Sequence, residues 1–559
     1  MAMAARRLAG RCRVPSALMP PFCRPAHVAR IQSYYEATRS IRTYNHHALA
    51  DGVRAEFPGL RLGRGSGGGV SGDGGGGGGS GVGGGGGGSG EGGGGRSGGG
   101  GGGTTSGAAP PVFADGASGS QLHQGAIDAA VRQMRDGAAN VGGGYGSSLA
   151  CDRAVADARA AMADFFLCDP CEVVFGPSMT ALAFHVARAL ERGARAPSES
   201  AIAHGWGASW IAAGANLVLD PFSHHANLSP WLRLAEACGA EVRWLPVAPA
   251  GASTGASAPS AGAPTPAALA GAFFSLDVST EALAPLIDAR TALVAVGAAS
   301  NGCGSVHDVA SLCAAAKELS SGGALTFVDA VHYAPHAALD VHQLGCDLLA
   351  CSPYKFFAPH AGVLHGRAEL LRALDFDRLS VQTDDLPCEA NGGMSRAELG
   401  TQSYESLAGT TAAVDYLASL GARFGGADAA APRRERLESG MHAIRAHEND
   451  LKRRFLEGAA AMGDGLRVLG HVDITPSALD ARTPTFAVAR RGMSGAHLAS
   501  ELVRQDVWCT AGNHYAQFWG AHSGGLANND EGMCRIGFLH YNTVAEVDRV
   551  LGAIESARP

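Results

Sequence analysis

The sequence contains very little lysine. Of its 44 basic residues only three are lysines, Lys317, Lys355 and Lys452, so arginine carries almost all of the positive charge. Long hydrophobic runs are missing too, because no apolar stretch reaches the roughly 18 residues that a membrane-spanning helix needs. There is no basic excess either, since the formal net charge is −7 and the pI is near 6.3. These absences argue against a membrane protein and against a nucleic-acid-binding protein.

Paired cysteine motifs are almost absent as well. The 13 cysteines are odd in number and mostly scattered, which argues against a disulfide framework and indicates a reducing compartment. One CxxC motif exists, Cys168-Asp-Pro-Cys171, and no second pair accompanies it. We interpret it as two part-buried thiols at a helix–strand turn, with a zinc or redox role as the alternative. No metal site is predicted.

Three segments of the chain have a biased composition that argues against a packed fold. Residues 1–45 are rich in arginine and poor in acidic residues, which predicts a transit peptide for the mitochondrion or the plastid. The alternative is a disordered basic tail on a cytoplasmic protein. A short helix is predicted within 46–64, followed by a disordered Gly-rich insert at 65–108, because glycine has no side chain to bury. Residues 248–266 are predicted to form a second low-complexity loop.

Short apolar runs alternate with helical patterns over residues 109–405. This alternation requires crossover connections and predicts a large α/β domain with a mostly parallel sheet. Residues 406–559 contain a long charged helix at 433–461 and a strand at 485–488, which indicates a smaller α+β domain. The strands predicted in the large domain are 172–175, 216–219, 241–245, 292–296, 324–328, 347–351 and 362–365. The remaining predicted helices are 154–166, 181–192, 230–238, 307–318, 495–505 and 544–554.

Polar residues follow several of these strands directly. In an open α/β sheet, ligands bind beyond the carboxyl ends of the strands, so these residues are expected to share one rim. One of the strands also runs into small residues at a helix N-terminus, an arrangement that suits an anion. The residues concerned are Ser178, Thr180, His224, Asp329, His332, Ser352 and Lys355.

Lys355 is the most informative of these residues. Its neighbours in the sequence are apolar or aromatic, so burial should lower the pKa of its amine and make it a usable nucleophile. Arginine cannot form an imine, which would explain why a chain so rich in arginine has lysine here. A lysine whose amine merely reaches solvent beside the sheet is the alternative. Lys317 and Lys452 are expected at solvated helix positions.

A family resemblance rests on four stretches of the sequence. The segment VDAVHYAPHAALDVHQLGCDLLACSPYKFFAPHAGVLHGR resembles the cofactor-binding block of class V pyridoxal-phosphate enzymes, in particular a cysteine desulfurase-like branch. The segments SHHANLSPW, ELGTQSYESLAG and MCRIGFLHYNTVAEVDRVLGAI agree with it. The resemblance covers roughly residues 48–64 and 111–557. It implies a fold-type I enzyme with a mostly parallel, seven-stranded type of sheet, pyridoxal 5'-phosphate as the cofactor, an amino-acid substrate and a homodimer.

The resemblance also implies a role for individual residues. Lys355 would hold the cofactor through an imine and later move the Cα proton, Asp329 would pair with the pyridine nitrogen, and His224 would stack on the ring. The other implied contacts are Ser178, Met179, Thr180 and Ser352 with the phosphate, Asn301 with the ring, His332 with the phenolic oxygen, Thr401 with the phosphate of the partner subunit, and Arg535 with the substrate carboxylate. The alternatives are an interior histidine for His224 or His332, a helix N-cap for Asp329, a turn residue for Asn301 or Thr401, and an ion-pair partner for Arg535.

One departure from the resembling family concerns the sulfur-accepting cysteine. Desulfurases need a mobile thiolate, and in the segment TAGNHYAQF the matching position is Tyr515. Cys509, six residues earlier, is expected to be buried. The predicted function is therefore chemistry on an amino acid through an external aldimine, by transamination, elimination or lyase chemistry. The alternative is a non-catalytic cofactor-binding homodimer that acts as a scaffold or reservoir.

Overall fold

The computed structural model describes residues 47–61, 109–195, 211, 214–245, 247–249, 274–276, 280–389, 395–516 and 533–559. The predictions of a transit peptide, of a Gly-rich insert and, for nearly all its length, of a low-complexity loop concern residues outside these ranges. Among the described residues, no helix combines the length and the apolar character needed to cross a bilayer.

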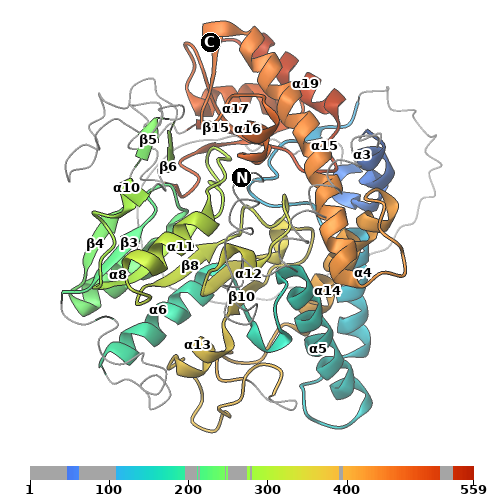
Figure 1. Ribbon diagram of the computed structural model, residues 1–559. Coiled ribbons are helices and arrows are strands. Elements are labelled where there is room, and N and C mark those ends of the chain that lie inside the picture. Colours follow the sequence, from blue (N-terminus) through green and yellow to red (C-terminus); the bar gives the residue numbers. More distant parts are fainter. Residues whose placement is uncertain are drawn as a thin grey trace, which may run out of the picture.

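A seven-stranded sheet forms the centre of the molecule, as predicted (Figure 1). Strand β10 runs antiparallel to both of its neighbours, and all the other pairs in the sheet are parallel. In sheet order the strands are β2 (Val173–Gly176), β10 (Gly362–Gly366), β9 (Leu348–Cys351), β8 (Leu325–Asp329), β7 (Thr291–Gly297), β3 (Asn216–Leu219) and β4 (Glu241–Trp244).

The sheet is covered on both faces, which explains the continuous apolar runs of its strands. Alternate residues of β8 face opposite ways: Phe327 packs in the core with α6 (Met179–Arg195) and α8 (Ser229–Cys238), and Val328 packs in the other core. That second core contains residues of α5 (Gly146–Phe166), α11 (Val309–Leu319), α14 (Tyr404–Arg423) and α15 (Arg433–Ala461). The two apolar faces therefore fix the sheet as the middle layer of three.

The C-terminal part forms a smaller α+β unit, as predicted. Its four-stranded antiparallel sheet has the order β11 (Leu466–Val468), β12 (Thr485–Arg490), β15 (Met533–Gly537) and β14 (Thr510–Gly512). A separate core of this unit unites these strands with α17 (Gly495–Arg504), α19 (Val544–Ser556) and the second half of α15. Figure 1 shows α15 passing along both units.

The start of the large domain differs from the predicted arrangement. Strand β1 (Val112–Phe113) pairs in parallel with β13 (Val507–Trp508), and Val112 is fully buried in the small core. A two-residue strand carries no alternating pattern, so the sequence gives no sign of this pairing. At the other predicted boundary, residue 405, α14 begins and packs on α5 and on α4 (Gln124–Asp136), both within the large domain.

The described N-terminal segment packs against the C-terminal unit. Helix α3 (His47–Val53) gives way to 3-10 turns at Arg54–Glu56 and Pro58–Arg61. Arg54 forms an ion pair of 2.6 Å with Glu546 on α19, and the ring of Phe57 is buried. The remaining short elements are β5 (Val247–Pro249), β6 (Phe274–Leu276), α10 (Thr280–Leu283), α12 (Val341–Leu344), α13 (Ala368–Ala373) and α16 (Pro476–Asp480).

Candidate active site

Lys355 lies in a 3-10 turn, Pro353–Lys355, directly after β9. Its side chain is buried, and Nζ donates hydrogen bonds to the carbonyl oxygens of Ala117 (2.5 Å) and Ser118 (2.9 Å). The turn is fixed from the same segment, because Oγ of Ser120 donates to the Tyr354 carbonyl (2.9 Å). The chain that follows β1 thus crosses over the lysine and holds its amine.

Electrostatics favour a neutral amine at this position. Burial, together with the neighbouring guanidinium of Arg535, lowers the pKa of Lys355 to about 7. Asp115 and Asp329 act in the opposite direction but do not offset the burial. At neutral pH an appreciable fraction of the amine is therefore unprotonated and nucleophilic, as the sequence predicts.

Asp329 ends β8, the strand next to β9 in the sheet. One carboxylate oxygen, Oδ1, accepts a hydrogen bond from the backbone N–H of Val331 at 2.9 Å. Within the described part of the chain, Oδ2 has no hydrogen-bond partner. Burial raises the pKa of Asp329 to about 6, while the Val331 N–H and the charge of Lys355 act against the rise. This carboxylate is thus suited to accept a hydrogen bond from a cationic ring nitrogen.

A helix N-terminus lies where the phosphate was predicted. Oγ of Ser178 accepts from the Ala181 N–H (3.1 Å), and the Met179 N–H donates to Oγ of Ser352 (3.3 Å), which joins the start of α6 to the end of β9. Gly362 makes the close approach possible, since a Cβ there would lie 2.3 Å from the carbonyl carbon of Ser178. Thr180 is exposed in the first turn of α6.

His224 stands before a 3-10 turn that follows β3. Its Nδ1 accepts from the Ala226 N–H at 3.0 Å, so the ring orientation is fixed. Burial, followed by the charges of Lys355, His225 and Arg535, lowers the pKa of His224 to about 4. A neutral ring beside the lysine is compatible with the predicted stacking role.

Arg535, on β15, brings the small unit into the site. Its side chain is buried, with Nη1 donating to the Asn301 carbonyl (3.0 Å) and Nη2 to Oγ of Ser118 (2.5 Å). Asp115 lies 3.5 Å away, and Nε is buried with no partner among the described residues. The Asn301 side chain donates to the carbonyl of His514 (2.7 Å). The guanidinium therefore has one buried N–H group, at Nε, that is available to donate a hydrogen bond to a ligand.

Two of the predicted site residues, His332 and Thr401, form no hydrogen bond to the site residues described above within the described part of the chain. His332 is buried, and its Nε2 shares a hydrogen bond with Oγ1 of Thr483 at 3.1 Å. Burial, followed by the neighbouring His336, Lys355 and Arg535, holds the pKa of His332 well below its usual range. Thr401 is exposed, and no interaction within the described residues connects it to the others.

Sequence reasoning missed four positions that shape the site. Ala117 and Ser118 contribute backbone carbonyls, which no residue-type pattern can signal. Asp115 lies beside Arg535 and accepts from Oγ of Ser118 at 2.8 Å. Asp220 is fully buried after β3, and its carboxylate accepts from the N–H of Phe222 (2.7 Å) and of Gly297 (3.1 Å), which shapes the loop before His224. For Asp220 a usable signal existed, since it is an acid directly after an apolar strand.

The cysteine and tyrosine predictions can be compared with the structure. Tyr515 is 69% exposed and has a left-handed backbone (φ 58°), and its ring centroid is 5.2 Å from that of His224. Its carbonyl accepts from the His225 N–H at 2.8 Å, so it lies at the rim of the site. Cys509 is buried as predicted, with Sγ 3.8 Å from that of Cys534.

Two sequence-based interpretations need correction. Lys452 is not solvated: it is buried, and its Nζ donates to the carbonyls of Leu479 (2.6 Å) and Arg482 (2.8 Å). These acceptors come from a later segment, so local sequence cannot signal them. The CxxC motif is not a pair of thiols: Cys168 is a buried free thiol, whereas Cys171 forms a disulfide with Cys388.

The site combines the four features that define a pyridoxal-phosphate site. They are a buried lysine after one strand, a carboxylate at the end of the neighbouring strand, a helix N-terminus that can bind an anion and an arginine that can bind a carboxylate. Comparison with known proteins agrees with this geometry. The sequence model of the family described as Aminotransferase class-V matches residues 112–270 and 275–550. The chain belongs to this family.

Curated relatives and solved structures extend the comparison. A cysteine desulfurase of Pectobacterium carotovorum is 28% identical over 371 residues, covering 63% of this chain and 74% of its own. The aminotransferase-like protein FGM3 of Gibberella zeae is 26% identical over 450 residues, covering 79% and 94%. Structures of cysteine desulfurases from Thermococcus onnurineus (TM-score 0.60, 23% identity) and Escherichia coli (0.57, 22%) each cover 80% of this chain and 94% of their own, and they share the fold.

These findings establish the general activity. Class V aminotransferases and cysteine desulfurases are pyridoxal-phosphate enzymes, so this chain is a pyridoxal-phosphate-dependent enzyme that acts on an amino acid. The side chains fit the cofactor on two independent points: Oδ2 of Asp329 has no partner in the described structure, and β10 approaches the phosphate turn at a position where only glycine fits.

Proposed function

We propose that this enzyme is a transferase or lyase that binds an α-amino acid by its carboxylate, activates a bond at Cα and forms no persulfide. The observation that carries the proposal is the placement of Arg535 beside Lys355, since both side chains donate hydrogen bonds to Ser118, Lys355 to its carbonyl and Arg535 to its hydroxyl. One buried cation can hold the substrate carboxylate while the lysine moves a proton a short distance away.

Each residue of the site has a defined task in this proposal. The bound cofactor supplies an electron sink for the electrons left at Cα. Asp329 would accept a hydrogen bond from the ring nitrogen and keep it protonated, and the His224 ring would lie against the cofactor ring. Ser178, Ser352 and the Met179 N–H bind the phosphate at the start of α6. Arg535 offers its free Nε–H edge to the carboxylate, and Lys355 accepts and returns the Cα proton at Nζ.

Tyr515 supports the exclusion of desulfurase chemistry. A desulfurase needs a thiolate at the substrate sulfur, and a phenol, with a pKa of about 10, gives no stable persulfide. Cys509 is buried next to Cys534 in the core of the small unit.

The test is a panel of amino acids given to the purified enzyme, with absorbance of the cofactor, keto-acid and ammonia as readouts. Keto-acid formation that requires an amino acceptor identifies a transferase, whereas release of ammonia or of a β-substituent identifies a lyase. Lys355→Ala is expected to lower turnover by about 10²–10⁴-fold.

A second measurement addresses sulfur directly. With L-cysteine and no added reductant, wild type is expected to form no protein persulfide, while Tyr515→Cys gains a thiol at the rim of the site. Rapid persulfide formation by wild type that disappears in Cys509→Ser would contradict the proposal. Slow sulfide release unchanged in Cys509→Ser would indicate elimination, which needs Lys355 but no cysteine.

We further propose a homodimer in which Thr401 contacts the phosphate held by the partner subunit. Support comes from its exposure and from the preceding residues: Leu399 is 54% exposed, and Gly400 turns the chain with φ 78°. A segment that presents an apolar side chain and a hydroxyl outward is suited to a subunit interface.

A further inference from the structure

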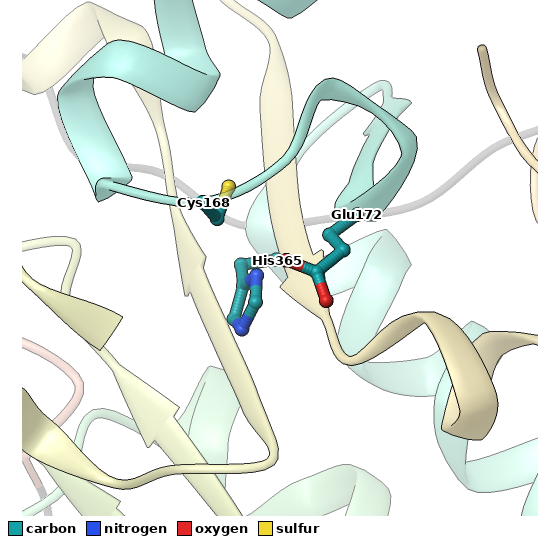
Figure 2. Close-up of side chains that lie close together, drawn as sticks. All are labelled: Cys168, Glu172 and His365. Carbon is teal, nitrogen blue, oxygen red and sulfur yellow. The ribbon is translucent and has the colours of Figure 1, made fainter. Parts of the chain in front are cut away.

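A second cluster of chemically active side chains lies far from the cofactor site. Cys168 follows α5, Glu172 precedes β2, and His365 lies on β10, and their ligand atoms are all within 4.8 Å of one another (Figure 2). His365 is paired with Val173 at the start of β2 and with Leu349 near the start of β9. Since Lys355 follows the carboxyl end of β9, the cluster lies at the opposite ends of the strands.

The local fold brings the three residues together. Helix α5 ends at Phe166, and the left-handed backbone of the next residue, Leu167 (φ 55°), turns the chain out of the helix. Asp169 and Glu172 form a reciprocal capping box around the 3-10 turn that leads into β2. Glu172 accepts from the N–H groups of Asp169 and Ala368, both at 3.2 Å, so its carboxylate is oriented. Each of its oxygens keeps a lone pair for a further partner.

The other two side chains lack partners although they are buried. His365 is 2% exposed, and its Nδ1 has no hydrogen-bond partner in the described structure. Cys168 is 5% exposed, and no hydrogen bond of its Sγ occurs among the described residues. Buried polar groups are normally satisfied, so an unpaired ring nitrogen next to a thiol and a carboxylate indicates a missing partner that all three share.

The charges of the cluster suit a cation. Nδ1 of His365 has no hydrogen-bond partner among the described residues, so it is free to act as a ligand. Cysteine binds a metal ion as the thiolate, so the Cys168 thiol would release its proton on binding. The thiolate and the Glu172 carboxylate would then balance the two charges of a divalent ion.

We propose that Cys168, Glu172 and His365 bind one divalent ion of the zinc class. Sulfur, nitrogen and oxygen donors together are typical of Zn²⁺ and exclude the all-oxygen preference of Ca²⁺ and Mg²⁺. Zinc–ligand distances of about 2.0–2.3 Å require the donors to move slightly inward on binding. The ion would connect the end of α5 to β2 and β10, a structural role distinct from the chemistry at Lys355.

The test uses the holoenzyme, treated with a chelator and then dialysed against Zn²⁺ alone. One zinc ion per chain is expected by elemental analysis, with a zinc-dependent rise in the thermal midpoint. Cys168→Ser and His365→Gln are each expected to weaken zinc binding at least about tenfold. Co²⁺ in place of zinc should give visible bands of a tetrahedral site and a thiolate charge-transfer band, and Cys168→Ser should remove the latter.

Matched variants separate this site from other thiols. Cys313→Ser, a buried thiol on α11 outside the cluster, is expected to retain zinc. The neighbouring group of Asp169, Cys171 and Cys388 offers thiolates only if the Cys171–Cys388 disulfide is reduced, and Cys388→Ser tests it. If Cys168→Ser fails to fold, the half-exposed Glu172→Gln decides. The proposal is overturned if wild type retains no zinc, if these substitutions leave zinc affinity unchanged, or if Cys388→Ser alone abolishes binding.

Discussion

Lys355 and Lys452 are both buried, and burial lowers the pKa of each to about 7. Their surroundings separate them. The amine of Lys452 donates to the carbonyls of Leu479 and Arg482, at and just beyond the end of α16, which makes a structural contact. The amine of Lys355 lies between an arginine and an aspartate that have unused hydrogen-bonding atoms. A lowered pKa alone therefore does not mark the catalytic lysine, and the neighbouring groups do.

The pKa of Lys355 gives a prediction for the cofactor-free protein. Only the unprotonated amine attacks an aldehyde, so the rate of borohydride-trappable attachment of pyridoxal phosphate should rise with pH and level off above about 7. Trapping over pH 5–10 with mass-spectrometric mapping of the label measures it. A half-rise near 10.4, the value of an ordinary lysine, or a label on Lys452, would show that the burial effect is absent or that the site is wrong.

At the scale of elements, the β2–α6 turn and β10 depend on one glycine. Gly362→Ala would place a methyl group against the Ser178 carbonyl, so the start of α6 must shift away from Ser352. Overpacking of this kind costs about 1–3 kcal/mol, and we expect cofactor affinity to fall by about ten- to a hundredfold. Equilibrium dialysis measures the change. Gly193→Ala, on the same helix with nothing near its Cβ, is the control and should bind normally.

A buried ion pair fixes the segment that leads to Thr401. Glu398 accepts from Arg159 on α5 at 2.6 Å and from the Phe175 N–H on β2 at 3.0 Å. Glu398→Ala leaves a buried guanidinium unpaired, and a loss of about 3–5 kcal/mol is expected in urea unfolding. Glu389→Ala removes an exposed partner of Arg372 and should cost less than about 1 kcal/mol. Equal effects of the two substitutions would contradict this account.

How far the sequence predicted the elements depends on their burial. Strands β7 and β8 were predicted within one residue at each end because they are continuous apolar runs covered on both faces. Helix α14 was missed because it is buried on most sides and so has no distinct polar face. Residue types at the strand ends identified Lys355 and Asp329 as candidates, and the family resemblance added Arg535, whereas the carbonyls of Ala117 and Ser118 carry no side-chain signal.

At the scale of the whole molecule, the proposed homodimer makes a testable claim about shared sites. When Lys355→Ala and Thr401→Ala subunits are mixed and allowed to exchange, hybrid dimers should form. In each hybrid, one site takes its lysine from the Thr401→Ala subunit and its threonine from the Lys355→Ala subunit. With equal mixing, about a quarter of all sites would be intact. Activity should therefore return on mixing. A monomer by sedimentation, or no recovery in hybrids isolated by differential tags, would count against shared sites.

The pairing of β1 with β13 has a consequence for biosynthesis. Val112 meets Val507 across 395 residues of sequence, and the same N-terminal segment supplies the carbonyls that hold Lys355. The ribosome releases this segment early, long before its partner strand exists. Contacts of such high sequence separation form late, because the entropy of closing a long loop must be overcome first. The lysine therefore reaches its final environment only when the chain is almost complete, and partly synthesised chains should not retain the cofactor.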